Sequence, residues 1–334
     1  MRAVTFFDGE LREGTLIVEH PEPGASGVRL LAQPPPPGTP RLDGDDGRTD
    51  SVVTGRFTDH HTHLQLVDSA ALPSSRLGRV VDLGGTSSVI AELAETLAHD
   101  EPSVTTVWAG PFLTAPGGYP SDRSWAASGA VAEIADAEQA TQAVRAAAAG
   151  GATLIKVVAH SLAGPTLSDE LFTAIVRAAH QHRLAVVAHA EGPGQATRAV
   201  RLGAALLAHA PFSERLSSSE LRMHAASAAW ISTLAIHDDA DRATAIDNIR
   251  RFRSLGGDVL YGTDMGNGEG VVDVREPEIV ALREAGVTGI DLLTALSPAS
   301  PVTPGEPLLL TPLDNPAAAR RLTADDAAAD NTAP

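Results

Sequence analysis

The sequence predicts an α/β protein built on a (β/α)8 TIM-type barrel, with a small, reduced β-sandwich formed by the two chain ends. The first observation is that apolar, strand-like runs alternate with amphipathic or alanine-rich stretches after about residue 55. The second is the count, because eight strand and helix units in roughly 250 residues are typical of this barrel. The third is that several runs end in histidine or aspartate, at the strand ends where such barrels carry their chemistry.

The expected elements follow one another in a regular order. Apolar runs predict strands at 57–60, 79–83, 104–109, 152–158, 184–189, 204–209, 228–236 and 258–263. The other stretches predict helices at 87–99, 136–149, 168–182, 194–202, 217–226, 240–255, 275–285 and 288–297. Ser168 and Ser217 support this register, since serine is favoured at the N-cap of a helix.

The two chain ends supply the predicted sandwich. Residues 3–9 and 14–19 read as strands, and residues 301–312 supply one returning strand. Four prolines at 34–37 begin a stretch that reads as a surface loop or a stiff linker. We therefore expect an appendage from 1–54 and 301–324, a barrel from 55–300, and a disordered tail from 325–334.

Side chains that bind metals stand at the ends of several strands. His61 and His63 are two residues apart, so in an extended strand they point to the same face, while His60 points to the other. Three further strands end in the same way, at His189, His209 and Asp264. One histidine at a strand end is most often only a satisfied polar residue. Their joint occurrence in one structural context favours a metal site.

Lys156 is the only lysine among the 25 lysine and arginine residues of the chain. It stands inside the apolar run 152–159. A desolvated lysine can lose its proton and become a nucleophilic amine, which arginine cannot do. Such an amine can take up carbon dioxide and form a carbamate, an anionic ligand able to bridge two metal ions. The alternative is a drift of composition towards arginine that spared one codon.

Taken together, these residues resemble the amidohydrolase superfamily, in particular its carbamylated-lysine, two-metal members close to prolidase-like and imidazolonepropionase-like amidohydrolases. The resemblance spans most of residues 52–297. It rests on segments 59–63 and 262–266 and on Lys156, His189 and His209, with softer similarity at 80–85 and 110–118. The family usually has a fuller sandwich than these chain ends supply.

The resemblance implies a role for each of six metal ligands. His61 and His63 with Asp264 would hold one divalent ion, His189 and His209 would hold the second, and carbamylated Lys156 would bridge them. The expected metal is zinc in both sites. A metal-bridging water or hydroxide would be the nucleophile, and Asp264 would accept its proton and pass it to the leaving group. The expected enzyme is a binuclear metal-dependent C–N hydrolase acting on an amide or cyclic amide of a small metabolite or dipeptide-like molecule.

Three other readings stay open. A lactonase or esterase would use the same site, because the same nucleophile attacks either kind of carbonyl. A mononuclear deaminase would leave Lys156 without a role. A catalytically silent metal-binding barrel would bind metal without turning over any ester or amide.

The sequence gives less support for particular substrate contacts than for the metal ligands. Tyr119 lies on the long segment between the third and fourth strands, which reads as a loop over the mouth of the barrel and also carries Trp125. His160 and His237 follow strand ends, although a loop histidine is more often solvated. A substrate carboxylate would require an arginine at the mouth, for which Arg123 is a candidate by position only. Four histidines on helices are expected at the surface, His99, His180, His182 and His224.

The global composition fits an enzyme of small molecules. The net charge of −17 argues against binding to nucleic acid or to an anionic membrane surface. No apolar stretch reaches transmembrane length and no signal peptide is evident, so a cytoplasmic location is the default expectation. The absence of cysteine excludes a thiolate zinc site. A homo-oligomer is compatible with the sequence, but the short sandwich gives little basis for predicting one.

Overall fold

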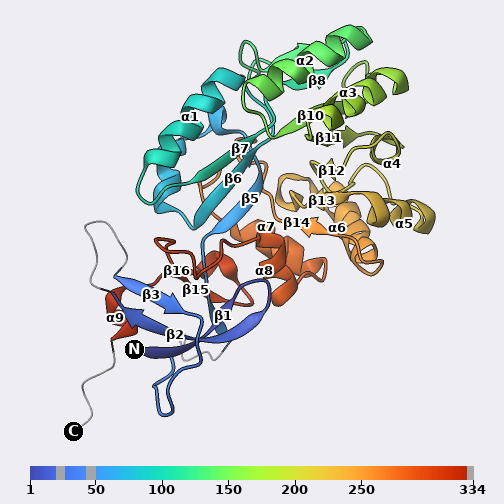
Figure 1. Cartoon of the computed structure of the whole chain (residues 1–334). Coiled ribbons are helices and arrows are strands. Elements are labelled where there is room, and N and C mark those ends of the chain that lie inside the picture. Colours follow the sequence, from blue (N-terminus) through green and yellow to red (C-terminus); the bar gives the residue numbers. More distant parts are fainter. Residues whose placement is uncertain (20–26, 43–49, 329–334) are drawn as a thin grey trace.

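A computed structural model of the chain describes residues 1–19, 27–42 and 50–328. Both chain ends contribute to one six-stranded sheet, in the order β16-β15-β4-β1-β2-β3, at one end of the molecule (Figure 1). Its strands are β1 (Arg2–Phe7), β2 (Leu11–Val18), β3 (Val28–Leu31), β4 (Ser51–Thr54), β15 (Leu309–Pro312) and β16 (Arg320–Arg321). The structure thus joins the predicted halves of the appendage, while a second sheet, which a sandwich would need, stays a prediction.

The remaining strands are parallel and form two sheets. The smaller contains β5 (Phe57–Thr62), β6 (Leu77–Asp82) and β7 (Thr105–Trp108). The larger has the order β14-β13-β12-β11-β10-β8-β9. Its strands are β8 (Phe112–Thr114), β9 (Val131–Glu133), β10 (Leu154–His160), β11 (Ala185–Glu191), β12 (Leu206–Leu207), β13 (Ala229–Ile231) and β14 (Val259–Leu260).

The two parallel sheets are connected at two places. The predicted third strand continues past Gly110, whose φ of 73° favours glycine, into β8, so that β7 pairs with β6 and β8 pairs with β10. At the second place, Thr62 and Met265 form a parallel bridge, and the His60 amide donates to the Tyr261 carbonyl at 3.0 Å. Strands β8 and β9 lie in the segment that the sequence predicted to be a long loop, which corrects that part of the prediction.

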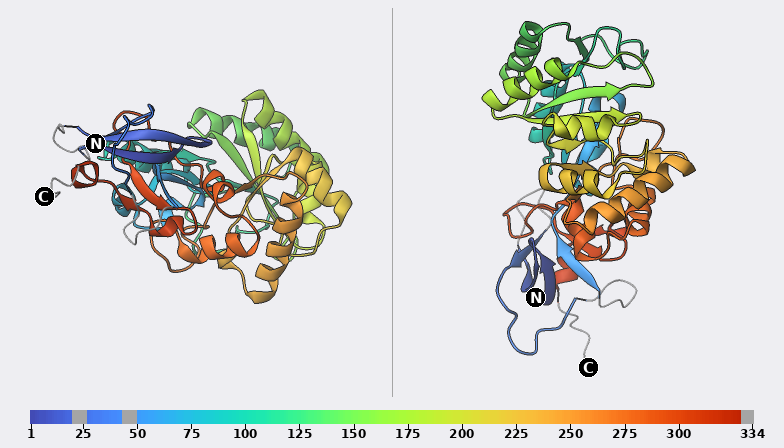
Figure 2. Two further views of the ribbon diagram at one scale, coloured as in Figure 1. Left: turned by 90° about the horizontal axis from the view of Figure 1, so that it is seen from below. Right: turned by 90° about the vertical axis from the view of Figure 1, so that its right-hand side faces the viewer.

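Helices cover the outside of the parallel strands (Figures 1 and 2). They are α1 (Ser87–His99), α2 (Ala137–Ala149), α3 (Asp169–Gln181), α4 (Gln195–Arg201), α5 (Ser218–Ser227), α6 (Asp239–Arg253), α7 (Glu276–Glu284) and α8 (Ile290–Leu296). Each agrees with a predicted helix to within two residues. The predicted N-caps are also confirmed, because the side chains of Ser168 and Ser217 accept hydrogen bonds from the first turns of α3 and α5. None of the helices in the described ranges has the length and apolar character needed to cross a membrane.

A short helix, α9 (Ala324–Ala327), occupies the start of the segment predicted to be a disordered tail. Ala327 is buried against the chain-end sheet with Leu322 and Leu310. Residues 325–328 are therefore ordered, which corrects that part of the prediction, and residues 329–334 lie outside the described residues. The other domain boundaries stay predictions.

One predicted surface histidine is instead part of the core. His224 of α5 is fully buried, and the Nε1 of Trp230 donates to its Nδ1 at 3.2 Å. The Trp230 ring also stacks on Phe252 of α6, with centroids 3.8 Å apart. His224 faces inward because its neutral ring supplies an acceptor for the buried indole N–H. His99, His180 and His182 are exposed, as predicted.

Candidate active site

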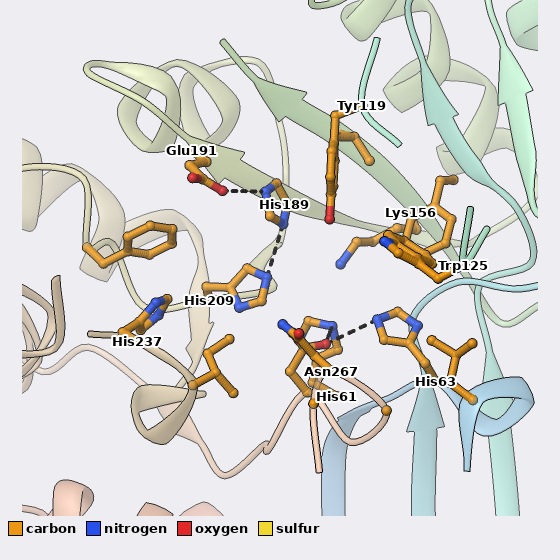
Figure 3. Close-up of a pocket in the computed structure, with 18 of the residues that line it drawn as sticks. His61, His63, Tyr119, Trp125, Lys156, His189, Glu191, His209, His237 and Asn267 are labelled. Atoms are coloured by element: carbon orange, nitrogen blue, oxygen red, sulfur yellow. Dashed lines mark hydrogen bonds and ion pairs between the residues drawn. The ribbon is translucent and has the colours of Figure 1, made fainter. Parts of the chain in front are cut away.

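Six predicted ligands converge on one cavity of about 620 Å³ at the carboxyl ends of the parallel strands (Figure 3). His61 lies at the end of β5 and His63 follows it, while Lys156 lies on β10 and His189 on β11. His209 and Asp264 follow β12 and β14. Parallel pairing brings these strand ends to one edge, so residues separated by more than two hundred positions meet there.

A chain of short contacts joins the histidines and the aspartate. Asp264 Oδ1 lies 3.0 Å from His61 Nε2 and 3.1 Å from His63 Nε2. His209 Nε2 lies 3.0 Å from His189 Nδ1. The donor atoms of His61, His209 and Asp264 all lie within 4.8 Å of one another, as the ligands of a metal ion would.

The hydrogen atoms of two histidine rings can be assigned from their outer contacts. His61 Nδ1 lies 2.8 Å from the Ala208 carbonyl, and His63 Nδ1 lies 3.1 Å from the Gly84 carbonyl. A carbonyl oxygen only accepts, so each Nδ1 must carry the hydrogen and donate it. In the neutral rings, each Nε2 then presents a lone pair to the carboxylate oxygen of Asp264.

The contact between His61 and Asp264 brings two buried acceptor atoms together. His61 Nε2 and Asp264 Oδ1 are buried and have no hydrogen-bond partner, although they lie 3.0 Å apart. Two acceptors at that distance repel one another unless a cation lies between or beside them. The donor set of imidazole nitrogen and carboxylate oxygen is the one that zinc and similar divalent ions take in proteins. The residues therefore fit a divalent metal.

Burial sets the protonation states that metal binding needs. It lowers the pKa of His61 to about 4 and holds that of His209 well below its usual range. Burial would raise the pKa of Asp264, but the contacts with His61 and His63 outweigh it and hold that pKa well below the usual range. His63 is the exception, since burial would lower its pKa but the interactions with Asp264 and Asp82 together outweigh burial and raise it.

Lys156 is buried within β10, with 1% of its surface exposed, and lines the cavity. Burial lowers the pKa of its amine to about 8, although Asp264 and Asp82 oppose that shift. In the described part of the chain, no acceptor lies within hydrogen-bond reach of Nζ. A neutral amine is therefore accessible near neutral pH, as carbamate formation requires.

His189 contacts the site and its surroundings with different ring nitrogens. Its Nδ1 faces His209, and its Nε2 lies 3.2 Å from Glu191 Oε2. His160 Nε2 lies 3.2 Å from the same oxygen. Glu191 thus orients His189 from outside, as carboxylates do for many metal-binding histidines.

The three predicted substrate contacts have different outcomes. Tyr119 and His237 line the cavity. His160 is not among its lining residues; its ring makes an edge-to-face contact with Tyr119, with centroids 5.1 Å apart, and its Nε2 pairs with Glu191. Arg123 also stays outside; its guanidinium lies 5.3 Å from the centre of the Tyr119 ring and pairs with Asp122.

Two buried carboxylates that sequence reasoning did not single out hold the first histidine pair. Asp59 accepts hydrogen bonds from the amides of His61 and Thr263 and from the Thr263 hydroxyl, which ties β5 to the segment after β14. Asp82, at the end of β6, accepts from the amides of Leu64 and Gly84. The acidic residue at the end of an apolar run was the available signal for Asp82.

Comparisons with known proteins support the fold. No family model matches the chain, and no curated protein matches it. Solved structures do. A putative prolidase from Bifidobacterium longum is 19% identical over 92% of this chain and 87% of its own, with a TM-score of 0.65. The ochratoxinase of A. niger is 16% identical over 78% and 77%, with a TM-score of 0.63, and phenylurea hydrolase B is 14% identical over 99% and 96%, also at 0.63.

These neighbours are amidohydrolase-superfamily enzymes. At such low sequence identity, the similarity shows a shared fold. The chemistry of this chain has to be argued from its own residues.

Proposed function

We propose that this protein is a metal-dependent hydrolase that cleaves a C–N bond, an amide or a cyclic amide, in a small molecule. The observation that carries the proposal is the buried contact of His61 Nε2 with Asp264 Oδ1, two acceptors held 3.0 Å apart. The hydrolase names of the structural neighbours agree with it. We also propose that the parallel strands close into a (β/α)8 barrel through the contacts at Thr62 and Met265.

Two divalent ions, which we propose to be zinc, match the residues present. His61, His63 and Asp264 would hold one ion, and His189 and His209 the other. A carbamate on Lys156 would hold both, because the buried amine lines the same cavity. The ions supply Lewis-acid chemistry when bound, acidifying water and polarising the carbonyl of the substrate.

The residues of the chain perform the proton transfers. Asp264, ionised in its buried setting, accepts a proton as water adds to the carbonyl carbon. It then delivers that proton to the nitrogen as the C–N bond breaks. Asn267 donates from Nδ2 to Asp264 Oδ2 at 2.8 Å and orients the carboxylate for both steps.

Lys156 takes up carbon dioxide through the lone pair of its neutral Nζ. A new N–C bond forms as one C–O π bond of carbon dioxide opens onto its oxygen, and one proton leaves the nitrogen for water, so the neutral amine becomes an anion. The burial that lowers the pKa of Lys156 therefore also makes its reaction possible.

The direct test is hydrolysis of a panel of amides and lactones by the metal-free protein and by the same protein reloaded with zinc. We expect turnover of amides only after reloading. Turnover of lactones alone would favour the lactonase reading, and bound zinc without turnover of any compound would contradict the hydrolase.

A second variant tests the carbamate. Lys156→Ala removes the bridging anion, and we expect a short carboxylic acid such as propionate to restore part of the activity. Propionamide has the same shape without the charge and serves as the control. Equal rescue by propionamide would contradict the carbamate.

A further inference from the structure

The cavity has an acidic outer end. Among the described residues that line it, Lys156 is the only lysine or arginine, whereas Asp238 and Asp241 at the start of α6 add carboxylates to those of Glu191 and Asp264. We propose that the substrate carries a protonated amine or a guanidinium group that binds at Asp238 and Asp241. This inference rests on the proposed function and narrows its substrate class.

Each of the two carboxylates has an oxygen available to a ligand. Asp238 is the N-cap of α6, and its Oδ1 accepts from the amides of Ala240 and Asp241, which leaves its Oδ2 unused by the helix. The side chain of Asp241 has no hydrogen bond or ion pair in the described part of the chain. The neighbouring Arg242 turns away and pairs with Glu284 at 3.0 Å. Among residues 1–19, 27–42 and 50–328, no lysine or arginine therefore pairs with either carboxylate.

The two charges also act on one another. Desolvation and the nearby charge of Asp238 raise the pKa of Asp241. A cation bound between the two carboxylates would relieve their repulsion. Because the group is largely exposed, each carboxylate alone contributes a modest attraction, and the pair contributes more.

Aromatic rings line the remaining walls. Phe212 packs on His237 with centroids 4.1 Å apart, next to the acidic end. Tyr119 and Trp125, with centroids 6.2 Å apart, face the cavity from the other side (Figure 3). Aromatic faces attract ammonium and guanidinium groups. The walls thus suit the same class of ligand as the carboxylates.

The inner end fixes where the reacting group must lie. His61 Nε2 and Asp264 Oδ1, buried and without hydrogen-bond partners, are aimed into this cavity. The reacting carbonyl therefore binds at the inner end and the cationic group at the outer end. A substrate carboxylate in the outer position would meet Asp238 and Asp241 and find no arginine, since Arg123 does not line the cavity.

Three hydroxamic acids of equal chain length test the inference by binding, because hydroxamates chelate zinc and report on the outer end without turnover. They derive from ε-aminocaproic acid, hexanoic acid and adipic acid, and they place an ammonium, a methyl or a carboxylate at the far end. We expect the zinc-loaded protein to bind the ammonium compound at least about tenfold more tightly than the carboxylate compound by titration calorimetry. Equal binding of the three, or a preference for the carboxylate compound, would overturn the inference.

Variants of the acidic residues test whether Asp238 and Asp241 cause the preference for the ammonium compound. Asp241→Asn keeps the shape of the side chain and should weaken binding of the ammonium compound about fivefold, with little change for the methyl compound. Asp238→Asn with Asp241→Asn should weaken it further, and asparagine preserves the N-cap. Asp239→Asn removes the same charge from the same helix turn outside the cavity and should have no effect. An equal loss in the Asp239 variant would assign the preference to the overall charge and overturn the inference.

Hydrolysis of the corresponding anilides separates this inference from the proposed function. A preference for the ammonium hydroxamate without turnover of any anilide or other amide would leave the acidic subsite standing and remove the hydrolase. Turnover in which the carboxylate anilide is the best substrate would retain the hydrolase and remove the acidic subsite.

Discussion

The two histidine pairs of the candidate site are held in different ways. His61 and His63 donate from Nδ1 to backbone carbonyls, those of Ala208 and Gly84. The second pair contacts side chains instead, with Glu191 beside His189 and Thr233 beside His209 at 2.9 Å. Backbone partners are common to all residue types, whereas side-chain partners can be changed by mutation. The first pair is thus fixed by the fold and the second by particular residues.

The partner of His209 is itself held by another side chain. Thr233 adopts a φ of 45°, which is unfavourable for a β-branched residue. Glu278 of α7 supports this turn, because its two carboxylate oxygens accept from the amides of Leu234 and Ala235 at 2.9 and 2.7 Å. His209 is therefore positioned by a threonine hydroxyl, which in turn depends on a buried glutamate.

The largest loss of activity is expected when Asp264, the carboxylate beside His61 and His63, is replaced. Asp264→Asn should lower kcat by about a hundredfold to ten-thousandfold, because an amide cannot accept and return the proton. Much of the zinc should remain, since the histidines and Lys156 are unchanged. Steady-state kinetics and elemental analysis of the same sample check both statements, and an unchanged rate would remove Asp264 from proton transfer.

The partners of the second pair should control metal affinity. Glu191→Gln and Thr233→Val should each weaken zinc binding by about tenfold to a hundredfold, measured by competition with a chromogenic chelator. Thr233→Ser retains the hydroxyl and serves as a matched control, as does Glu92→Gln, which changes an exposed carboxyl on α1. If affinity is the same in all four variants, the side chains do not hold this pair.

Glu278 should make stability depend on pH. Burial raises the pKa of its carboxyl from 4.5 to about 7, so the folded chain binds this proton more tightly than the unfolded chain. The stabilisation is fully present below pH 4.5 and is lost as the pH rises through 7, with a total of roughly 3 kcal/mol. Urea unfolding of the parent and of Glu278→Gln across this range should give curves that lie close together at low pH, where both side chains are neutral, and separate as the pH rises through 7, because only the parent loses this stabilisation. Parallel curves would contradict the assignment.

The smallest change in zinc content and kcat is expected for a residue far from both histidine pairs. His182→Ala changes an exposed residue at the end of α3, so neither zinc content nor kcat should change. A loss of zinc in this variant would mean that ligands lie outside the cavity described here.

The order of strands and helices could be predicted because its signals are local. Apolar runs and helix N-caps such as Ser168 are visible in short windows of sequence. The broken third strand could not, since only three residues of β8 follow Gly110 and their partner is β10. His224 was wrongly expected at the surface because its partner, the indole of Trp230, belongs to a different element.

The convergence of the six candidate ligands on one cavity could be predicted because most of them stand at or just after the end of a recognisable strand. The residues that position them could not. Asp59 and Glu278 accept from backbone amides, which every residue offers, so their sequence carries no sign of the partner. Asp238 combines a structural role with a place in the cavity, since it is the N-cap of α6 and also lines the cavity.

We propose that Lys156 and the two histidine pairs form one binuclear metal site. Elemental analysis of protein purified without chelators or metal affinity resin measures its metal content, with Lys156→Ala analysed in parallel. We expect about two zinc ions per chain in the parent and fewer in the variant. About one ion per chain in both proteins would contradict the bridged site.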